Sequence, residues 1–249
     1  MIAAINQQWR RHRPGVQMNL ESPRLYSERV QWLKLHDERR DQGEWCDKLK
    51  ARSKVAALGF GDLLVPLADK APCLCKNNHD SGYPVICRTE EERRRAVARL
   101  KQKHRAYGVN KGEWGYAGIK PQVYCERLLE DPIDCKFHMV QGELRMIQLA
   151  TGGASGTRYC LMYLPDGTPI SQRLSMREHW VPQPPMLPDW VAGLRWIADA
   201  LATGYRYVRV DLLYAQKRPW FGEMTFWPMS GYCDPANDAY FGDLIEWQP

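Results

Sequence analysis

The chain has 249 residues, with 35 Lys and Arg against 29 Asp and Glu, which gives a net charge of +6 at pH 7. Its 44% hydrophobic and 26% charged content is ordinary for a globular protein and argues against disorder. No apolar run approaches the length of a membrane-spanning helix, and the N-terminus lacks the apolar region of a secretory signal. We therefore expect a cytoplasmic protein without a membrane span.

The eight cysteines are scattered along the chain, several of them inside apparent strands. No CxxC pair and no Cys/His cluster has the spacing of a zinc site, so we interpret the cysteines as small buried hydrophobic residues. The positive charge would suit an anionic small substrate, ATP or an acidic polymer. No segment resembles an RNA-binding module, and we expect no nucleic-acid partner. The sequence carries no signal for an oligomeric state.

The first half of the chain predicts two helices and then a small group of strands. Helices are expected over 24–37 and from Asp47 to Gly59 or Gly61. Short strands are expected over 63–67, 73–76 and 85–87. The polar loop 77–82 joins the last two strands, and such a loop can form a flap whose backbone N–H groups bind phosphate. Polar hairpin loops are common, and a structural role is the simpler interpretation of its histidine.

The middle of the chain begins with a helix and continues with strands. Thr89–Glu92 has the pattern of a capping box before a charged helix that should end near Gly108. Further strands are expected over 121–129, 134–140, 143–149 and 158–164, followed by a helix over 189–203. Alternation along 134–140 places Asp134, Lys136 and His138 on one face, which taken alone we interpret as an ordinary polar sheet face.

The last strand pair lies within residues 207–227, is joined by a short polar turn around Gln216–Pro219, and carries the strongest chemical signal. Alternation gathers Arg209, Asp211, Glu223 and Thr225 on one face. A turn centred near Lys217 would place Asp211 opposite Glu223. Facing carboxylates repel unless a cation lies between them, and two acidic donors with a hydroxyl suit Mg²⁺. Alternatively, Arg209 simply neutralises one carboxylate on a solvated face.

In their order and spacing, these segments resemble the TupA-like branch of the ATP-grasp superfamily, which is linked to bacterial surface-polysaccharide biosynthesis. The segments that carry the resemblance are Asn78–Gly82, Lys120–Pro121 with Glu126, Asp134–Phe137, Val208–Leu212 and Phe221–Thr225. The resemblance implies an α+β ATP-grasp fold, in which two α/β subdomains with largely antiparallel sheets clasp ATP. The expected division is a basic, helical segment over 1–46, a small subdomain with the phosphate loop over 47–125, and a large subdomain with the metal site over 126–249.

The resemblance also assigns roles to single residues. The residues that would contact the ATP phosphates are Lys48, Lys76 and the mobile loop of Asn78, His79, Asp80, Ser81 and Gly82. The hinge that would meet adenine is Glu126, Arg127, Leu128 and Leu129, with Asp134 near the ribose. The catalytic cations would be Arg209, Lys76 and Lys136. The ligands of Mg²⁺ would be Asp211 and Glu223, with Thr225 where many members place an asparagine.

The implied activity is an ATP- and Mg²⁺-dependent carboxylate–amine ligase that forms an amide through an acyl phosphate. Its substrates would be an amine and a small-molecule or glycan carboxylate, such as a sugar acid of a capsule or teichuronopeptide-like precursor. A glycosyltransferase is one alternative, and a glycoside hydrolase that uses Asp211 and Glu223 is another. A non-catalytic carbohydrate- or nucleic-acid-binding module using loop tryptophans is the third.

Overall fold

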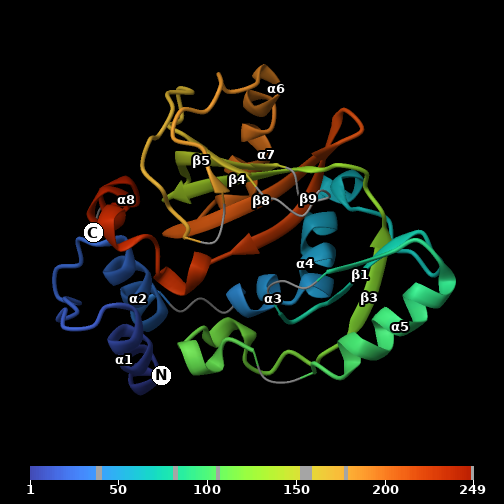
Figure 1. Cartoon of the computed structure of the whole chain (residues 1–249), viewed down its shortest axis with the longest axis horizontal. Coiled ribbons are helices and arrows are strands. Elements are labelled where there is room, and N and C mark those ends of the chain that lie inside the picture. Colours follow the sequence, from blue (N-terminus) through green and yellow to red (C-terminus); the bar gives the residue numbers. More distant parts are fainter. Residues whose placement is uncertain (38–40, 81–83, 105–106, 152–158, 177–178, 248–249) are drawn as a thin grey trace.

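The structure is a computed structural model that describes residues 1–37, 41–80, 84–104, 107–151, 159–176 and 179–247. Two sheets organise it, a three-stranded sheet in the order β2-β1-β3 and a six-stranded sheet in the order β7-β6-β5-β4-β8-β9 (Figure 1). The strands are β1 (Cys73–Asn77), β2 (Val85–Cys87), β3 (Val123–Arg127), β4 (Ile133–Val140), β5 (Glu143–Thr151), β6 (Tyr159–Tyr163), β7 (His179–Trp180), β8 (Tyr207–Ala215) and β9 (Arg218–Thr225). The β6–β7 pairing is parallel and the other pairings of these strands are antiparallel, which confirms the α+β class.

Helices flank both sheets. They are α1 (Ile2–His12), α2 (Tyr26–His36), α3 (Gln42–Cys46), α4 (Lys48–Val55), α5 (Glu90–Lys101), α6 (Asp189–Ala192), α7 (Arg195–Ala202) and α8 (Asp238–Leu244). The capping box of α5 is confirmed, since Glu92 N–H donates to Thr89 Oγ1 at 3.2 Å and Thr89 N–H donates to Glu92 Oε2 at 3.2 Å. No helix among the described residues is long and apolar enough to cross a membrane.

The main core lies on one face of the six-stranded sheet. Alternate residues of β8, namely Val208, Val210 and Leu212, are buried there and pack with Phe137 and Met139 of β4. Helix α7 covers this face and contacts both strands, while α3 and α4 contact β9 (Figure 1). Each buried aliphatic or aromatic side chain contributes about 1.5–3 kcal/mol to folding. This packing holds the opposite face of β8 and β4, which carries the polar residues, in a fixed position.

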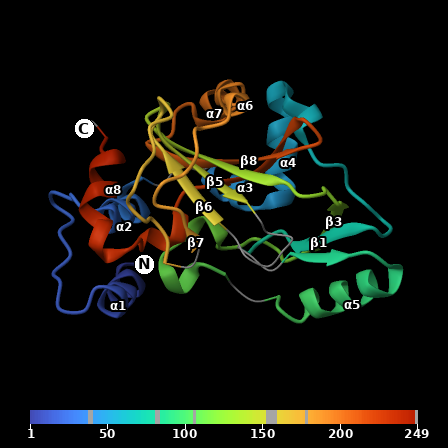
Figure 2. The same cartoon turned by 45° about the horizontal axis from the view of Figure 1, so that its top comes forward.

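The three-stranded sheet has its own small core. Helix α5 packs against it, and the turned view in Figure 2 shows α5 on the side of β1 and β3 away from the six-stranded sheet. Cys75 and Cys125 are direct partners in the β1–β3 register, with Cα atoms 4.1 Å apart, and they form a disulfide. Our interpretation of the cysteines as simple buried hydrophobic residues is therefore wrong for this pair.

Three elements differ from the sequence predictions. The expected strand 63–67 contains the end of a 3₁₀ turn, Gly61–Leu63, and only an isolated bridge from Leu67 to Glu126. Pro66 cannot donate a ladder hydrogen bond, which explains why no regular strand forms there. The helix expected over 189–203 is interrupted between α6 and α7 by Gly193 and Leu194. Helix α5 ends at Lys101, before the predicted end near Gly108.

Candidate active site

The β8–β9 hairpin has the predicted register, with Asp211 opposite Glu223 and Arg209 opposite Thr225. Its turn residues Gln216 and Lys217 have φ of 55° and 60°, as in the mirror-image turns that match the twist of paired strands. The pairing shifts by one residue after Asp211, so that Gly222 forms a bulge. The two carboxylates therefore lie side by side on the polar face.

Asp211 is the centre of a charged network on this face. It is 3% exposed, and its two carboxylate oxygens accept from Nε and Nη2 of Arg209, both at 2.6 Å. The neighbouring strand β4 brings Lys136 opposite Asp211 in the register. Lys136 Nζ donates to Asp211 Oδ2 at 2.8 Å and to Asp134 Oδ2 at 2.7 Å. Arg209 Nη2 also lies 3.6 Å from Glu223 Oε1.

The polar face of β4 is buried, which corrects our interpretation of it as an ordinary sheet face. His138 is fully buried and its Nδ1 lies 2.8 Å from the hydroxyl of Tyr207. Burial lowers the pKa of His138 well below its ordinary value, and Arg209 adds to this effect. The Tyr26 hydroxyl of α2 lies 3.4 Å from that of Tyr207, so α2 covers this part of the sheet.

Neighbouring charges keep Lys136 and Glu223 charged at neutral pH. Burial alone would lower the pKa of Lys136, but Asp134 and Asp211 outweigh it and raise that pKa. Burial alone would raise the pKa of Glu223, but Lys48 and Arg209 outweigh it and lower that pKa. The site therefore holds ionised carboxylates and cations in contact.

Lys48 links the network to the loop that follows β1. It begins α4, whose N-terminus is capped by Asp47 through a 3.0 Å bond from Leu49 N–H. Lys48 Nζ lies 3.7 Å from Glu223 Oε2 and donates to the carbonyl oxygen of Asp80. The structure thus brings the predicted phosphate-binding lysine, the loop and a predicted metal ligand together.

A cavity of about 550 Å³, which we call the first cavity, lies beside the three-stranded sheet. Lys76 lines it and forms a 2.5 Å ion pair with Glu126, which also pairs with Arg52 at 2.8 Å. The four predicted hinge residues, Glu126, Arg127, Leu128 and Leu129, all line this cavity. Its other walls are largely apolar, with Val65, Leu74, Ile86, Ile133 and Leu213. An apolar slot with a few charged groups at its edge is suited to a nucleotide base.

The predicted phosphate loop is described only in part, because Ser81 and Gly82 lie outside the described residues. The side chain of Asn78 points into the protein, where Nδ2 donates to Asp47 Oδ1 at 3.0 Å and Oδ1 accepts from Gln122 N–H at 2.7 Å. His79 is 3% exposed and lies edge-on to His104. These side chains therefore order the base of the loop, and contacts of this loop with phosphate stay a prediction.

A second cavity, of about 610 Å³, lies beside Arg209 and Thr225. Its lining comes from residues 8–13, 107–116, 175–176, 209 and 225–235. The sequence predicted part of it, the loop 227–232 beside the metal site, but not the wall formed by residues 8–13. Basic side chains, including Arg13 and Lys111, line it together with aromatic ones, including Tyr116 and Tyr232. The signal in the sequence for this wall is the basic run 10–13.

A buried lysine supports the floor of the second cavity. Lys34 Nζ donates to Gln31 Oε1 at 2.9 Å and to the carbonyl and hydroxyl oxygens of Ser230 at 3.1 and 2.9 Å. Met229 and Ser230 have φ of 53° and 56°, a left-handed conformation that is costly for residues other than glycine. Burial lowers the pKa of Lys34 to about 8. These bonds hold the strained loop against α2.

The donor set fits a magnesium-bound nucleotide. Thr225 Oγ1 accepts from Arg209 Nη2 at 3.3 Å and donates to Glu223 Oε1 at 3.2 Å, so its hydroxyl lies beside the two carboxylates. Carboxylate and hydroxyl oxygens are hard ligands of the kind that Mg²⁺ takes. Lys48 and Lys76 supply cations near these oxygens and in the first cavity.

Comparison with solved structures gives the fold. The chain is similar to the D-alanine–D-alanine ligase of Helicobacter pylori, at 11% identity and a TM-score of 0.51, over 90% of this chain and 69% of that one. It is also similar to an L-amino acid ligase of Bacillus licheniformis, at 14% identity and a TM-score of 0.49, over 92% of this chain and 55% of that one. Among curated proteins, none matches this chain.

The family is shown by the sequence itself. The family model described as TupA-like ATPgrasp matches residues 28–246, which is most of the chain. This span contains both sheets and the charged network around Asp211. The chain therefore belongs to the TupA-like ATP-grasp family.

Proposed function

We propose that this protein is an ATP- and Mg²⁺-dependent carboxylate–amine ligase. The observation that carries the proposal is that the charged network connects the surroundings of two cavities. At one end Asp134 follows Ile133, which lines the first cavity. At the other end Arg209 and Thr225 line the second cavity. Group transfer requires two ligands held close together in a fixed geometry, and a charged network shared by two cavities could hold them in that way.

In this proposal the first cavity holds the nucleotide. The backbone of 126–129 and the apolar walls would bind adenine, with Asp134 near the ribose and Lys48 and Lys76 on the phosphates. Asp211 and Glu223, with Thr225, would hold Mg²⁺. The metal would supply neutralisation of phosphate charge. The loop residues His79 to Gly82 would contribute backbone N–H groups, since both the backbone N–H and the side chain of Asn78 are occupied within the protein.

The second cavity would hold the carboxylate substrate. One of its carboxylate oxygens would attack the γ-phosphorus of ATP, ADP would leave, and an acyl phosphate would form. An amine would then attack the acyl carbon and release phosphate, leaving an amide. Arg209 and Lys136 would stabilise the charge of the transferring phosphoryl group. The basic and aromatic lining fits an acidic, ring-containing substrate, and a sugar acid of a surface-polysaccharide precursor is the one we propose.

The alternatives fit the site less well. A glycoside hydrolase needs one carboxylic acid with a raised pKa, whereas Lys48 and Arg209 lower the pKa of Glu223 against the effect of burial. A binding module would use its loop tryptophans, but Trp227 is 4% exposed and packs edge-on against Trp114 at 5.4 Å. The exposed Trp196 lies on α7, away from these loops in the sequence. No observation in the described part of the chain favours a glycosyltransferase.

The test is ADP release by the purified protein with ATP, Mg²⁺ and a panel of uronic acids combined with amino acids. We expect release to rise when a matching acid and amine are both present. The Asp211→Asn variant should lose activity, whereas Asp243→Asn, at an exposed position of α8, should keep it. Titration calorimetry gives the decisive result. If the folded protein does not bind MgATP, or if Asp211→Asn binds it as tightly as the unchanged chain, the proposal is wrong.

A further inference from the structure

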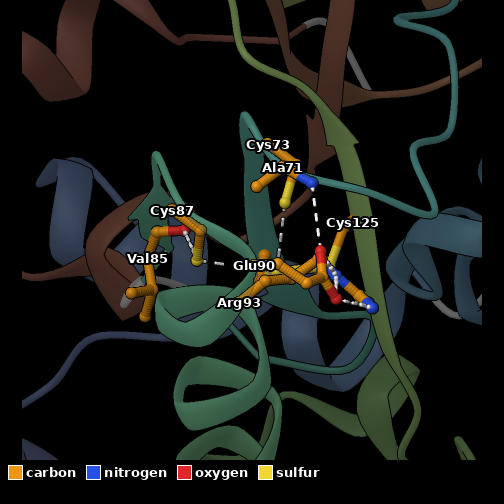
Figure 3. The surroundings of a disulfide bond; sticks show 8 residues. Ala71, Cys73, Val85, Cys87, Glu90, Arg93 and Cys125 are labelled. Carbon is orange, nitrogen blue, oxygen red and sulfur yellow. Dashed lines mark hydrogen bonds and ion pairs between the residues drawn. A yellow bond between two sulfur atoms is a disulfide. The ribbon is translucent and has the colours of Figure 1, made fainter.

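Four cysteines lie on one face of the three-stranded sheet, in the layer between the sheet and α5 (Figure 3). Cys73 and Cys75 come from β1, with Cys87 opposite Cys73 on β2 and Cys125 opposite Cys75 on β3. Three of them are fully buried and Cys125 is 7% exposed. Their neighbours in this layer are apolar and include Ala96 and Leu100 of α5.

The sulfur atoms of Cys73, Cys75 and Cys125 form one close group, and the sulfur of Cys87 lies beside that of Cys75. Cys75 Sγ lies 3.7 Å from Cys73 Sγ and 3.9 Å from Cys87 Sγ, and it is bonded to Cys125 Sγ. The sulfurs of Cys73, Cys75 and Cys125 all lie within 4.8 Å of one another. A tetrahedral zinc site with Zn–S bonds of about 2.3 Å has its sulfurs about 3.8 Å apart. Both non-bonded distances agree with this spacing.

We propose that Cys73, Cys75, Cys87 and Cys125, once fully reduced, bind one zinc ion as a closed tetrathiolate site. A dithiol reductant, oxidised to its own disulfide, would supply two electrons and two protons and convert the Cys75–Cys125 bond into two thiols. The four thiols would then release four protons to solvent, and the four thiolates would bind one Zn²⁺ in a complex of net charge −2. Zinc and the disulfide are therefore alternative states of one cluster.

The surroundings can accommodate this charge. Arg93, in the first turn of α5, interacts electrostatically with Cys73 and would offset part of it. The apolar side chains around the sulfurs exclude water and competing ligands. Soft thiolate sulfur selects zinc over the hard Mg²⁺ that we place at the carboxylates, so the two sites would not compete for metal.

The cluster lies directly behind residues of the first cavity. Lys76 follows Cys75, Glu126 follows Cys125, and both face the first cavity because successive residues of a strand point to opposite faces. A zinc ion bound to β1, β2 and β3 would join the three strands of a sheet that has only a small core of its own. We infer a structural site that holds the wall of the first cavity.

The test uses full-length protein reduced with a phosphine under nitrogen and then separated from the reductant. Cobalt(II), which replaces zinc in thiolate sites, is added first. We expect intense visible bands of tetrahedral cobalt, their loss when zinc is added, and about one zinc per chain by mass spectrometry. Protein kept as the disulfide should show none of these bands. Absence of tetrahedral cobalt bands in the reduced, folded chain would overturn the proposal.

Variants locate the site. Cys73→Ala and Cys87→Ala leave the disulfide-forming pair intact, and each should abolish tetrahedral cobalt binding. Cys160→Ala, which removes a buried cysteine of β6 in the other sheet, should bind cobalt as the unchanged chain does. Far-ultraviolet circular dichroism checks that each variant is folded. Unchanged tetrahedral bands in folded Cys73→Ala and Cys87→Ala would refute the site, and this readout does not depend on ligase activity.

Discussion

Replacing Gly222 with alanine tests whether the bulge in β9 positions Asp211. The added Cβ would lie 2.8 Å from the backbone oxygen of Asp211, whereas ordinary contacts begin at 3.4 Å. The difference is an overlap of about 0.6 Å. A backbone oxygen of the paired strand cannot rotate away, so the hairpin must open at this point. Overpacking of this kind costs about 1–3 kcal/mol. In a chain of this size, each kcal/mol lowers Tm by about 2–4 °C.

The same displacement should reach the chemistry. Asp211 would move relative to Glu223, and a misplacement of about 1 Å can reduce a rate about 100-fold. We expect Gly222→Ala to bind MgATP more weakly by calorimetry and to release ADP about 10- to 100-fold more slowly. Gly61→Ala is the matched control, because its Cβ would meet nothing within 4 Å and its φ is −55°. Equal urea midpoints and equal MgATP affinities for the two variants would refute the role of the bulge.

Three further substitutions test other parts of the site. Arg13→Met removes the ion-pair partner of buried Asp238, whose carboxylate lies 2.8 Å from Arg13. The free energy of unfolding in urea should fall by about 3–5 kcal/mol, and a fall below about 1 kcal/mol would contradict this prediction. Lys76→Met should weaken ATP binding about 10-fold and leave adenosine binding unchanged in calorimetry, because only a phosphate contact is lost. An equal loss of affinity for both ligands would contradict the assignment of Lys76 to the ATP phosphates. Burial lowers the pKa of Lys34 from 10.5 to about 8, so the unfolded chain binds more protons between these values and stability rises with pH. The free energy of unfolding of the unchanged chain should therefore rise, relative to that of Lys34→Met, by about 1.4 kcal/mol per pH unit between about pH 8 and 10. A difference between the two unfolding free energies that does not change with pH would contradict this.

Features set by neighbouring residues could be predicted from the sequence. The two strands of the β8–β9 hairpin are close along the chain, so alternation and a short turn were enough to place Asp211 opposite Glu223. The capping box of α5 depends on residues three apart, and it too was confirmed. In both cases the interacting groups are brought together by local geometry alone.

Features that depend on distant segments could not be predicted in this way. Cys75 and Cys125 are 50 residues apart, and only the β1–β3 register shows that they are partners. The walls of the second cavity come from segments that are far apart in the sequence, between residues 8 and 235, and meet only in the folded chain. The Asn78 side chain points inward because it bonds to Asp47 and Gln122, which are distant in the sequence. The turn-forming residues around Asn78 predict a loop, but they do not predict which way its side chain points.

The observed ion pairs also bear on the two interpretations of the β8–β9 hairpin. Arg209 does neutralise Asp211, as the simpler interpretation expects, but it does so on a buried face instead of a solvated one. Around it, Lys48, Lys136 and Arg209 balance Asp134, Asp211 and Glu223, three cations against three carboxylates. A buried charge without a partner costs several kcal/mol, so these carboxylates need cations in every state of the site. Arg209 and Lys48 can therefore turn toward a phosphate only when another cation takes their place at the carboxylates. The observed pairing and the proposed binding of MgATP then follow from one requirement of charge balance.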